Sequence, residues 1–244
     1  MLANEMKFNF MLKYDALFEF SAPAYDDRQI SYLLTAAQNR VFLDRYYAPS
    51  DKYKKGFESD EKRRKDLEQL IKTASIGEGT IAKVTVTDIH PNGQMVTLPL
   101  NFLYPIEESA KLTGSTTWIP VKPVRHDEYV ANINNPYKKP YSNLVWRMDY
   151  SRGTDPTGTT EPATIAKRVE LIHDGTGLAD YRVRYLTMPP EIVVDEYTPA
   201  NQVHCVLDEI LHDTIVDEAV KIAKAAVKPE EYQISAVEKD SGDD

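Results

Sequence analysis

The sequence predicts an α+β fold in which helices from both ends of the chain pack together and a β-rich insertion of antiparallel strands lies between them. Two observations lead to this prediction. Apolar residues recur at helical spacing near both ends, in residues 26–47 and 202–227, whereas residues 79–194 alternate apolar and polar positions between turns. Since helices and sheets each bury one face, the two kinds of element must cover each other in layers.

The expected parts of the chain follow from the same patterns. They are an N-terminal helical part at 1–78, a β-rich insertion at 79–200, a C-terminal helix at 201–228 that packs on the N-terminal helices, and an acidic tail at 229–244.

Composition limits the class of protein. With 244 residues, 42% of them hydrophobic, the chain can build a core without disulfides or structural metals, as one domain or as two small ones. The single cysteine, Cys205, cannot form an internal bridge, which is typical of a reducing compartment. No apolar run reaches the roughly 20 residues that span a bilayer, and charges interrupt the N-terminus too often for a signal peptide. We therefore expect a soluble intracellular protein with no membrane partner.

The N-terminal part contains one clear amphipathic helix. Before it, an aromatic-rich segment up to Phe20 is predicted to be extended or a short helix. Asp26 and Asp27 offer N-caps for the main helix, and Ala48-Pro49-Ser50 ends it. Its apolar positions, which fall on one face, are Ile30, Leu33, Leu34, Ala37 and Val41.

A second helix is expected from about Glu58 to Thr73. Its interior, Lys62-Arg63-Arg64-Lys65, is the most basic cluster in the chain. Acidic residues lie close by in sequence, so a solvated helix with local ion pairs is the plainer interpretation, and contact with another subunit is the functional one.

The middle of the chain has the pattern of β-structure. A hairpin is expected from Ala82–Thr87 through the turn Pro91-Asn92-Gly93 to Gln94–Leu98. Arg125–Val130 is expected to form a helical turn, and the polar tract Gly153–Pro162 offers nothing to a core. The further expected strands are Ser115–Val121, Leu144–Tyr150, Arg168–Ile172 and Tyr181–Leu186.

The last helix, expected from about Gln202 to Val227, gives the strongest periodic signal, and Pro229 ends it. Its apolar stripe comprises Val206, Leu207, Ile210, Leu211, Thr214, Ile215, Ala219, Ile222, Ala223 and Ala226. From Val203 onward the chain has eleven acidic residues and four lysines, so most of the net charge of −9 lies there. Because a nucleic-acid site needs cations that displace counterions from phosphate, specific DNA binding is not expected.

Motifs for catalysis or cofactors are absent from the sequence. It has no phosphate-binding loop, no glycine-rich dinucleotide motif and no GxSxG elbow. His204, Asp208 and His212 would share a helical face and could bind zinc, but no fourth ligand is evident, and a polar helix face is the simpler interpretation. His126-Asp127-Glu128 and Asp195-Glu196 are isolated charged clusters. We expect no catalytic, cofactor or metal site.

Tyrosine is abundant, with 15 tyrosines against 7 phenylalanines. Several of the tyrosines lie near turns or strand edges, where a ring with a polar tip suits a surface that becomes an interface. Ordinary half-buried strand tyrosines explain the same pattern equally well.

Several phrases, together with the order of the elements, resemble the neck and tail ring proteins of tailed bacteriophages, of the head-to-tail adaptor or tail-tubular gatekeeper type. The resemblance is strongest to ring proteins of crAss-like phages, and it covers most of the chain. The phrases are Ile30–Gln38, Gly56–Arg64, Val96–Tyr104, Asn135–Pro140 with Trp146-Arg147, and Tyr185–Pro190 before Leu211–Val220.

The resemblance implies a virion structural protein without catalysis, made in the bacterial host cytoplasm. Copies would form a twelve-fold homo-oligomeric ring that is part of the genome-ejection conduit, the channel through which the genome passes. The ring's partners would be the portal or adjacent neck or tail ring proteins and the capsid, and DNA would be present only as the transiting genome. Ring closure needs two different surfaces on each copy. The alternative is a strand-rich carbohydrate- or protein-binding module of phage origin, for which only the tyrosine content speaks.

Two sets of residues are the candidates for these roles. The interface candidates are Arg63, Arg64, Tyr137, Lys138, Lys139, Tyr141, Trp146 and Thr157. The candidates for lining the channel are Asp208, Glu209, Asp217 and Glu218, whose charge would keep DNA from binding the wall.

Overall fold

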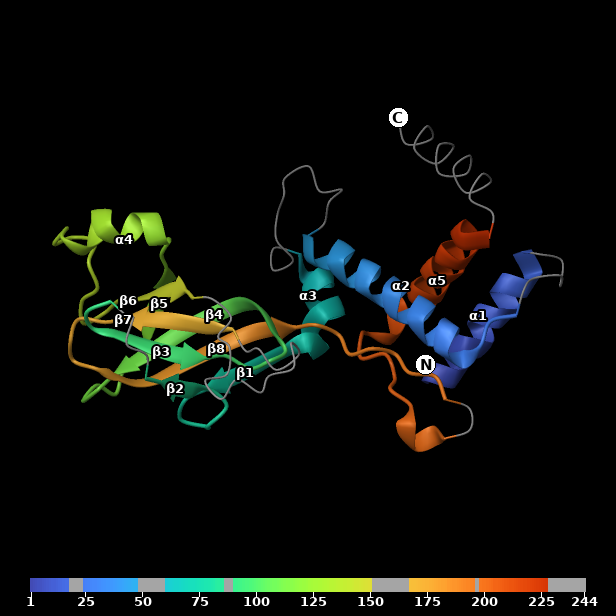
Figure 1. The fold of residues 1–244 in the computed structure, drawn as a ribbon, viewed down its shortest axis with the longest axis horizontal. Coiled ribbons are helices and arrows are strands. Elements are labelled where there is room, and N and C mark those ends of the chain that lie inside the picture. Colours follow the sequence, from blue (N-terminus) through green and yellow to red (C-terminus); the bar gives the residue numbers. More distant parts are fainter. Residues whose placement is uncertain (18–23, 48–59, 86–89, 151–166, 196–197, 228–244) are drawn as a thin grey trace, which may run out of the picture. The chain divides into compact units, whose positions relative to one another are not determined.

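The computed structural model describes residues 1–17, 24–47, 60–85, 90–150, 167–195 and 198–227 (Figure 1). The chain divides into two compact units. Unit 1 combines both ends of the sequence, Met1–Leu70 and Pro189–Asp244, and unit 2 is the continuous segment Ile71–Met188. The predicted tract 153–162, with Thr157, and the acidic tail 229–244 lie outside the described residues.

Unit 1 is helical. Its helices are α1 (Ala3–Leu17), α2 (Asp27–Tyr47), α3 (Glu61–Leu67) and α5 (His212–Val227). Both α1 and α2 pack against α5 (Figure 1). The predicted packing of terminal helices is therefore confirmed.

The start of α2 is fixed by reciprocal hydrogen bonds. The backbone N–H of Gln29 donates to Oδ1 of Asp26 at 2.7 Å, and the N–H of Asp26 donates to Oε1 of Gln29 at 3.1 Å. This capping box satisfies two backbone donors that a helix start leaves without partners. The apolar face predicted for this helix is confirmed, since all five of its predicted positions are buried; they are Ile30, Leu33, Leu34, Ala37 and Val41.

Two predicted helices were too long. Residues 71–73, expected at the end of the second helix, belong to strand β1 (Ile71–Ser75), because this segment pairs with β8 along the whole of its length. Residues 202–208 are not helical: Val203 exchanges two backbone hydrogen bonds of 3.1 Å with Val193. The helical turns begin only after Asp208, whose carboxylate accepts from the N–H of Ile210 at 3.0 Å. The N-terminal segment, by contrast, is a full 15-residue helix.

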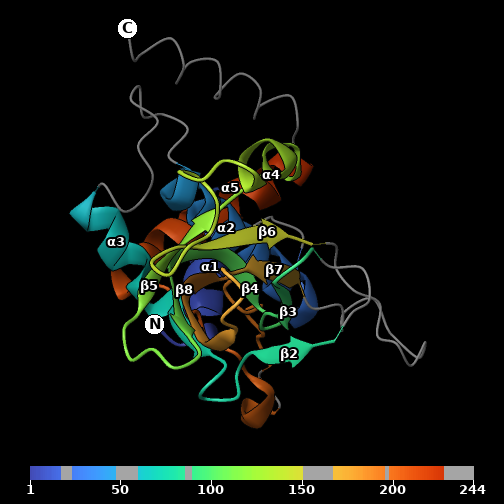
Figure 2. The same cartoon turned by 90° about the vertical axis from the view of Figure 1, so that its left-hand side faces the viewer.

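Unit 2 is an eight-stranded curled sheet with the strand order β1-β8-β4-β5-β6-β7-β3-β2 (Figures 1 and 2). The strands after β1 are β2 (Ala82–Val84), β3 (Gly93–Thr97), β4 (Phe102–Leu112), β5 (Ile119–Pro123), β6 (Val145–Asp149), β7 (Arg168–Ile172) and β8 (Leu178–Thr187). The predicted hairpin is confirmed, with Ala82 opposite Thr97. The strand expected at 115–121 starts later, at Ile119.

All neighbouring strands are antiparallel except β5 and β6. These two are parallel because helix α4 (His126–Ile133) carries the chain across between them. The predicted helical turn at 125–130 is thus a slightly longer helix, and it lies outside the sheet over β5 and β6 in both views (Figures 1 and 2).

A buried ion pair lies in unit 2. Arg147 Nη1 is 2.7 Å from Glu108 Oε2, both side chains are less than 10% exposed, and the Tyr181 hydroxyl donates to the same carboxylate. Burial and the neighbouring carboxylate raise the pKa of Tyr181. Gly93 lies beside a second buried carboxylate, Glu170, and any side chain at this position would overlap its Oε1 atom.

The core of unit 1 gives a stability prediction. Leu34 is fully buried, so Leu34→Asp should remove several kcal/mol, on the order of the total stability, and yield protein without a cooperative thermal transition by circular dichroism. Ile210 is the matched control. It belongs to the predicted apolar stripe, but the prediction that it is buried was wrong, since it is 70% exposed. Ile210→Asp should melt as the parent does; equal damage from both variants would contradict this assignment of the core.

Candidate functional site

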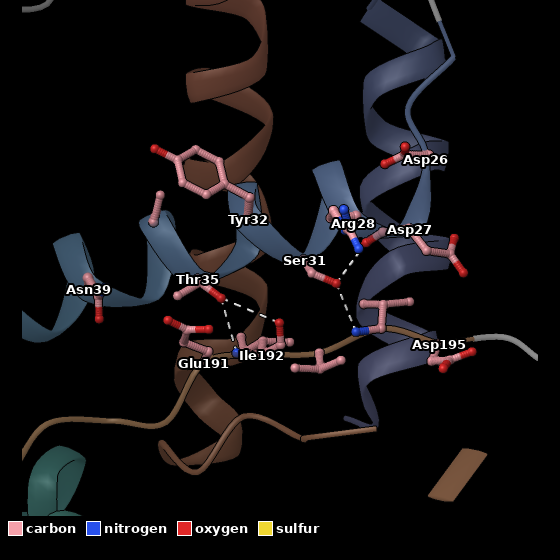
Figure 3. Close-up of a pocket in the computed structure, with 13 residues that line it drawn as sticks. Asp26, Asp27, Arg28, Ser31, Tyr32, Thr35, Asn39, Glu191, Ile192 and Asp195 are labelled. Carbon is pink, nitrogen blue, oxygen red and sulfur yellow. Dashed lines mark hydrogen bonds between the residues drawn. The ribbon is translucent and has the colours of Figure 1, made fainter. Parts of the chain in front are cut away.

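One face of α2 holds an extended segment that is distant in sequence. Ser31, Thr35 and Gln38 follow each other at spacings of four and three residues, so their side chains share one helical face. Thr35 Oγ1 accepts from the N–H of Ile192 at 3.0 Å, and Ser31 Oγ accepts from the N–H of Val194 at 2.9 Å (Figure 3). Gln38 Nε2 donates to the carbonyl of Pro190 at 2.7 Å. We call this set of contacts the α2 clasp.

A groove of about 1070 Å³ lies along the α2 clasp (Figure 3). We call it the acidic groove, because four carboxylates and one guanidinium line it: Asp26, Asp27, Glu191, Asp195 and Arg28. Asp27 also pairs with Lys7 at 2.7 Å, and Asp195 accepts from the N–H of Thr198 at 2.8 Å.

The groove also offers an exposed aromatic ring and a buried acceptor. Tyr32 is 73% exposed and points away from the bound segment (Figure 3). The Asn39 Oδ1 atom is buried without a hydrogen-bond partner. The groove is therefore richer in acceptors than in donors, which favours a cationic occupant. No local sequence pattern predicts this groove, because the residues of its two walls that bond to each other are 157 and 163 positions apart in the chain.

Four of the predicted interface residues form an exposed surface between α4 and β6. Tyr137 is 92% exposed and Tyr141 is 48% exposed, and Lys138 and Lys139 between them are exposed as well. Asn135 shapes this loop, because its Oδ1 accepts from the N–H of Tyr137 at 3.0 Å. Together with Val130 on α4, which is 72% exposed, these four residues are the α4–β6 surface.

Trp146, also predicted at an interface, lies elsewhere. It is 1% exposed and packs edge-on against Tyr129, with ring centroids 6.3 Å apart. The Trp146 ring packs between β6 and α4 and is not accessible to another subunit, so it is not part of the proposed contact surfaces.

The predicted basic cluster lies on α3. Asp60 caps this helix by accepting from the N–H of Lys62 at 3.0 Å, and Arg63 is 3.6 Å from the same carboxylate group. Lys62, Arg64 and Lys65 are exposed. In the described part of the chain, no carboxylate lies within ion-pair distance of these three side chains.

The predicted channel-lining acids all have contacts within unit 1. Asp217 pairs with Lys13 of α1 at 2.7 Å, and Glu218 pairs with Arg40 of α2 at 3.2 Å. Asp208 caps a helical turn, and the Glu209 side chain is 89% exposed. Exposed pairs of this kind contribute at most about 1 kcal/mol each. The Asp217 side chain is 54% exposed and that of Glu218 only 24%, and Asp208 is a cap, so a change of charge at Glu209 and Asp217 should disturb the fold least.

The proposed zinc-binding face does not form. His204 and Asp208 precede the helix, and His204 Nδ1 accepts from the N–H of Ala3 at 3.1 Å. His212 is 3% exposed; its Nε2 lies 3.0 Å from the carbonyl of Leu207. Within the described ranges, no three side chains that bind metals are grouped. Cys205 is buried, and burial raises the pKa of its thiol to about 11.

Helix α1 has an exposed apolar surface that the sequence did not predict. Helix α1 buries Met6, Phe10 and others on one face, yet Phe8, Met11 and Leu12 are 67%, 42% and 56% exposed. These three positions, at spacings of three and one, form a second apolar stripe, the outer α1 face. A helix that is apolar on two faces shows no amphipathic pattern, which is why the sequence did not predict this helix firmly.

The main surface features of the described residues are thus exposed apolar, aromatic and charged side chains. Residues 1–233 match the family model described as phage tail ring protein 3/4. Ring protein 4/5 of Bacteroides phage crAss001 is 30% identical over 239 residues, which cover 93% of each chain. Ring protein 3 of the same phage is 22% identical over 211 residues, covering 81% of this chain and 84% of that protein.

The chain therefore belongs to the phage tail ring protein 3/4 family, and the resemblance seen in its sequence is confirmed. Among the described helices, none is both long enough and apolar enough to cross a bilayer.

Buried His212 gives a pH prediction. Burial lowers the pKa of His212 from its ordinary value of 6.5, so below about pH 6.5 the unfolded chain binds a proton that the folded chain does not. Stability should therefore fall as the pH drops from 7 towards 5, by up to about 1.4 kcal/mol per pH unit for this group. Burial also lowers the pKa of His173, which adds a loss of the same sign.

Urea unfolding at pH 7.5, 6.5 and 5.5 measures this dependence. His212→Asn should flatten it, and His212→Asn with His173→Asn should flatten it further. An unchanged slope in both variants would show that other groups cause the acid sensitivity.

Proposed function

We propose that this chain is a structural subunit of a closed homo-oligomeric ring in the neck or tail of a tailed phage, stacked on the portal or on adjacent ring proteins, and that the ring surrounds the path of the genome. Membership of the ring protein family supports the ring, and the outer α1 face is the structural observation that supports it best. An exposed stripe of large apolar residues is costly in water and stable when another subunit covers it.

The outer α1 face gives the assembly prediction. Burying two such side chains contributes about 3 kcal/mol or more, so Phe8→Ser with Leu12→Ser should raise the concentration needed for rings about a hundredfold. Light scattering on a sizing column and negative-stain images with radial symmetry measure the effect. Twelve copies per ring is the expected number.

A matched control keeps the test specific. Leu100 is a large side chain of unit 2 that is 62% exposed, and Leu100→Ser should leave ring formation unchanged. A parent protein that stays monomeric at every concentration would overturn the closed homo-oligomeric ring. Rings that are unaffected by the α1 changes would overturn only the role of this face.

The genome path gives a second prediction. If Glu209 and Asp217 line the channel, their charge keeps DNA from binding to its wall. Glu209→Lys with Asp217→Lys should then leave rings intact and create DNA binding that weakens steeply with salt, whereas Glu107→Lys with Glu128→Lys in unit 2 makes the same change of net charge as a control. Loss of rings in the first variant, with folded protomers, would instead place these acids in a contact between subunits.

The second candidate function is a carbohydrate- or protein-binding module. The α4–β6 surface favours it, because the exposed rings of Tyr137 and Tyr141 could pack against a sugar. A monomer with saccharide affinity that Tyr137→Ala abolishes would support this function over the ring.

A further inference from the structure

Resting on the proposed function, we propose a specific contact between neighbouring copies in the ring. The exposed basic side chains of α3 on one copy dock in the acidic groove of the next copy, and the contact repeats head to tail around the ring.

The acidic groove has the chemistry to hold cations. Asp26 and Glu191 add negative charge beside Asp27 and Asp195; Arg28 is the cation among the lining residues, and Lys7 pairs with Asp27 from outside the lining. The exposed ring of Tyr32 can lie against an ammonium or guanidinium group. At about 1070 Å³ and open to solvent, the groove has room for several long side chains.

Helix α3 presents the complementary charge. Lys62, Arg64 and Lys65 are exposed on this helix. Arginine suits this partner well, because its planar group donates to carboxylates in pairs. Among residues 60–68 the exposed acidic side chains are Asp60, which pairs with Arg63, and Glu61 and Glu68, so the three exposed cations exceed the two remaining acids by one.

Within one copy the two surfaces lie at different places along α2. The groove lies along the first half of α2, from Asp27 to Asn39. Helix α3 is held at the other end of α2, where Arg45 Nε is 3.3 Å from the largely buried carboxylate of Asp66. Along α2, Asp27 is 18 residues from Arg45, or about 27 Å at 1.5 Å per residue, and the last lining residue, Asn39, is six residues from it, or about 9 Å. Among the described residues, no carboxylate of the groove pairs with Lys62, Arg64 or Lys65 of the same copy, which leaves these cations available to the groove of a neighbouring copy.

This placement meets the requirement for a ring. A closed ring with one subunit type needs two different surfaces on each copy that fit one another. The acidic groove and the basic face of α3 belong to the same compact unit, so their separation along α2 is fixed. DNA is not expected to bind in the groove, because the carboxylates of the groove repel the phosphates of DNA.

A charge exchange tests the contact in the full chain. Variant X carries Arg64→Glu and Lys65→Glu, which make α3 acidic. Variant Y carries Tyr32→Lys, Ala36→Lys and Glu191→Lys, which make the groove basic and spare the acids that cap α2 and the 195–198 turn. Each variant alone should need at least tenfold more protein than the parent to form rings.

An equimolar mixture of X and Y should form rings again, because the acidic α3 of X fits the basic groove of Y and the basic α3 of Y fits the acidic groove of X. The two variants would alternate, so such rings hold an even number of copies. Assembly of the parent should also weaken as salt shortens the range of charge interactions from about 10 Å at 0.1 M to about 3 Å at 1 M.

The outcomes separate this contact from the proposed function. If the parent forms rings and either X alone forms them equally well or the mixture does not recover them, the contact is wrong and the ring stands. If Y alone fails and X does not, the groove has another occupant, which also overturns the contact.

A parent that forms no rings overturns the proposed function, and cross-linking then decides the contact. Arg64→Cys with Glu191→Cys, in a Cys205→Ala background, should give disulfide-linked chains under mild oxidation. Linked chains without closed rings would retain the contact alone, and the absence of links would overturn both.

Discussion

The α2 clasp is the constraint on which unit 1 depends. The chain leaves unit 1 after Leu70 and returns at Pro189, and the returning segment 190–194 is extended, without helical hydrogen bonds of its own. Backbone groups that are shielded from water need partners. Ser31, Thr35 and Gln38 supply them from one face of α2. The pairing of Val193 with Val203 then directs the chain towards α5, and the helical turns that lead into α5 begin at the Asp208 cap.

Charge in unit 1 is distributed along the same helix. Carboxylates gather at the first half of α2, and an arginine at its other end holds α3 with its cations. The acids of α5 are tied to Lys13 and Arg40 and so stabilise the packing of the terminal helices, whatever else they do. A subunit that separates opposite charges along one rigid element is suited to head-to-tail association, because each end attracts the other end of a neighbour.

The surface residues were predictable to different degrees. Tyr137, Lys138, Lys139 and Tyr141 follow a turn signal of asparagine and proline, and turns lie at the surface, so their exposure follows from local sequence. Trp146 stands in a strand that was predicted, but its residues Val145–Met148 are all buried, because α4 covers one face of it, and alternation along the chain cannot show that both faces are covered. The acidic groove needed both α2 and the segment 190–195, which no local pattern relates.

The sequence by itself determined the elements whose signals are local: α2 with its buried face and capping residues, the hairpin from Ala82 to Thr97, and the family. Only the tertiary structure decided that Ile71–Ser75 is a strand and that residues 202–208 are not helical. In both cases the backbone finds hydrogen-bond partners in a distant segment, β8 in one and Val193 in the other. The gain from these partners outweighs a helical propensity that differs by less than about 1 kcal/mol per residue, so spacing along the chain could not foretell it.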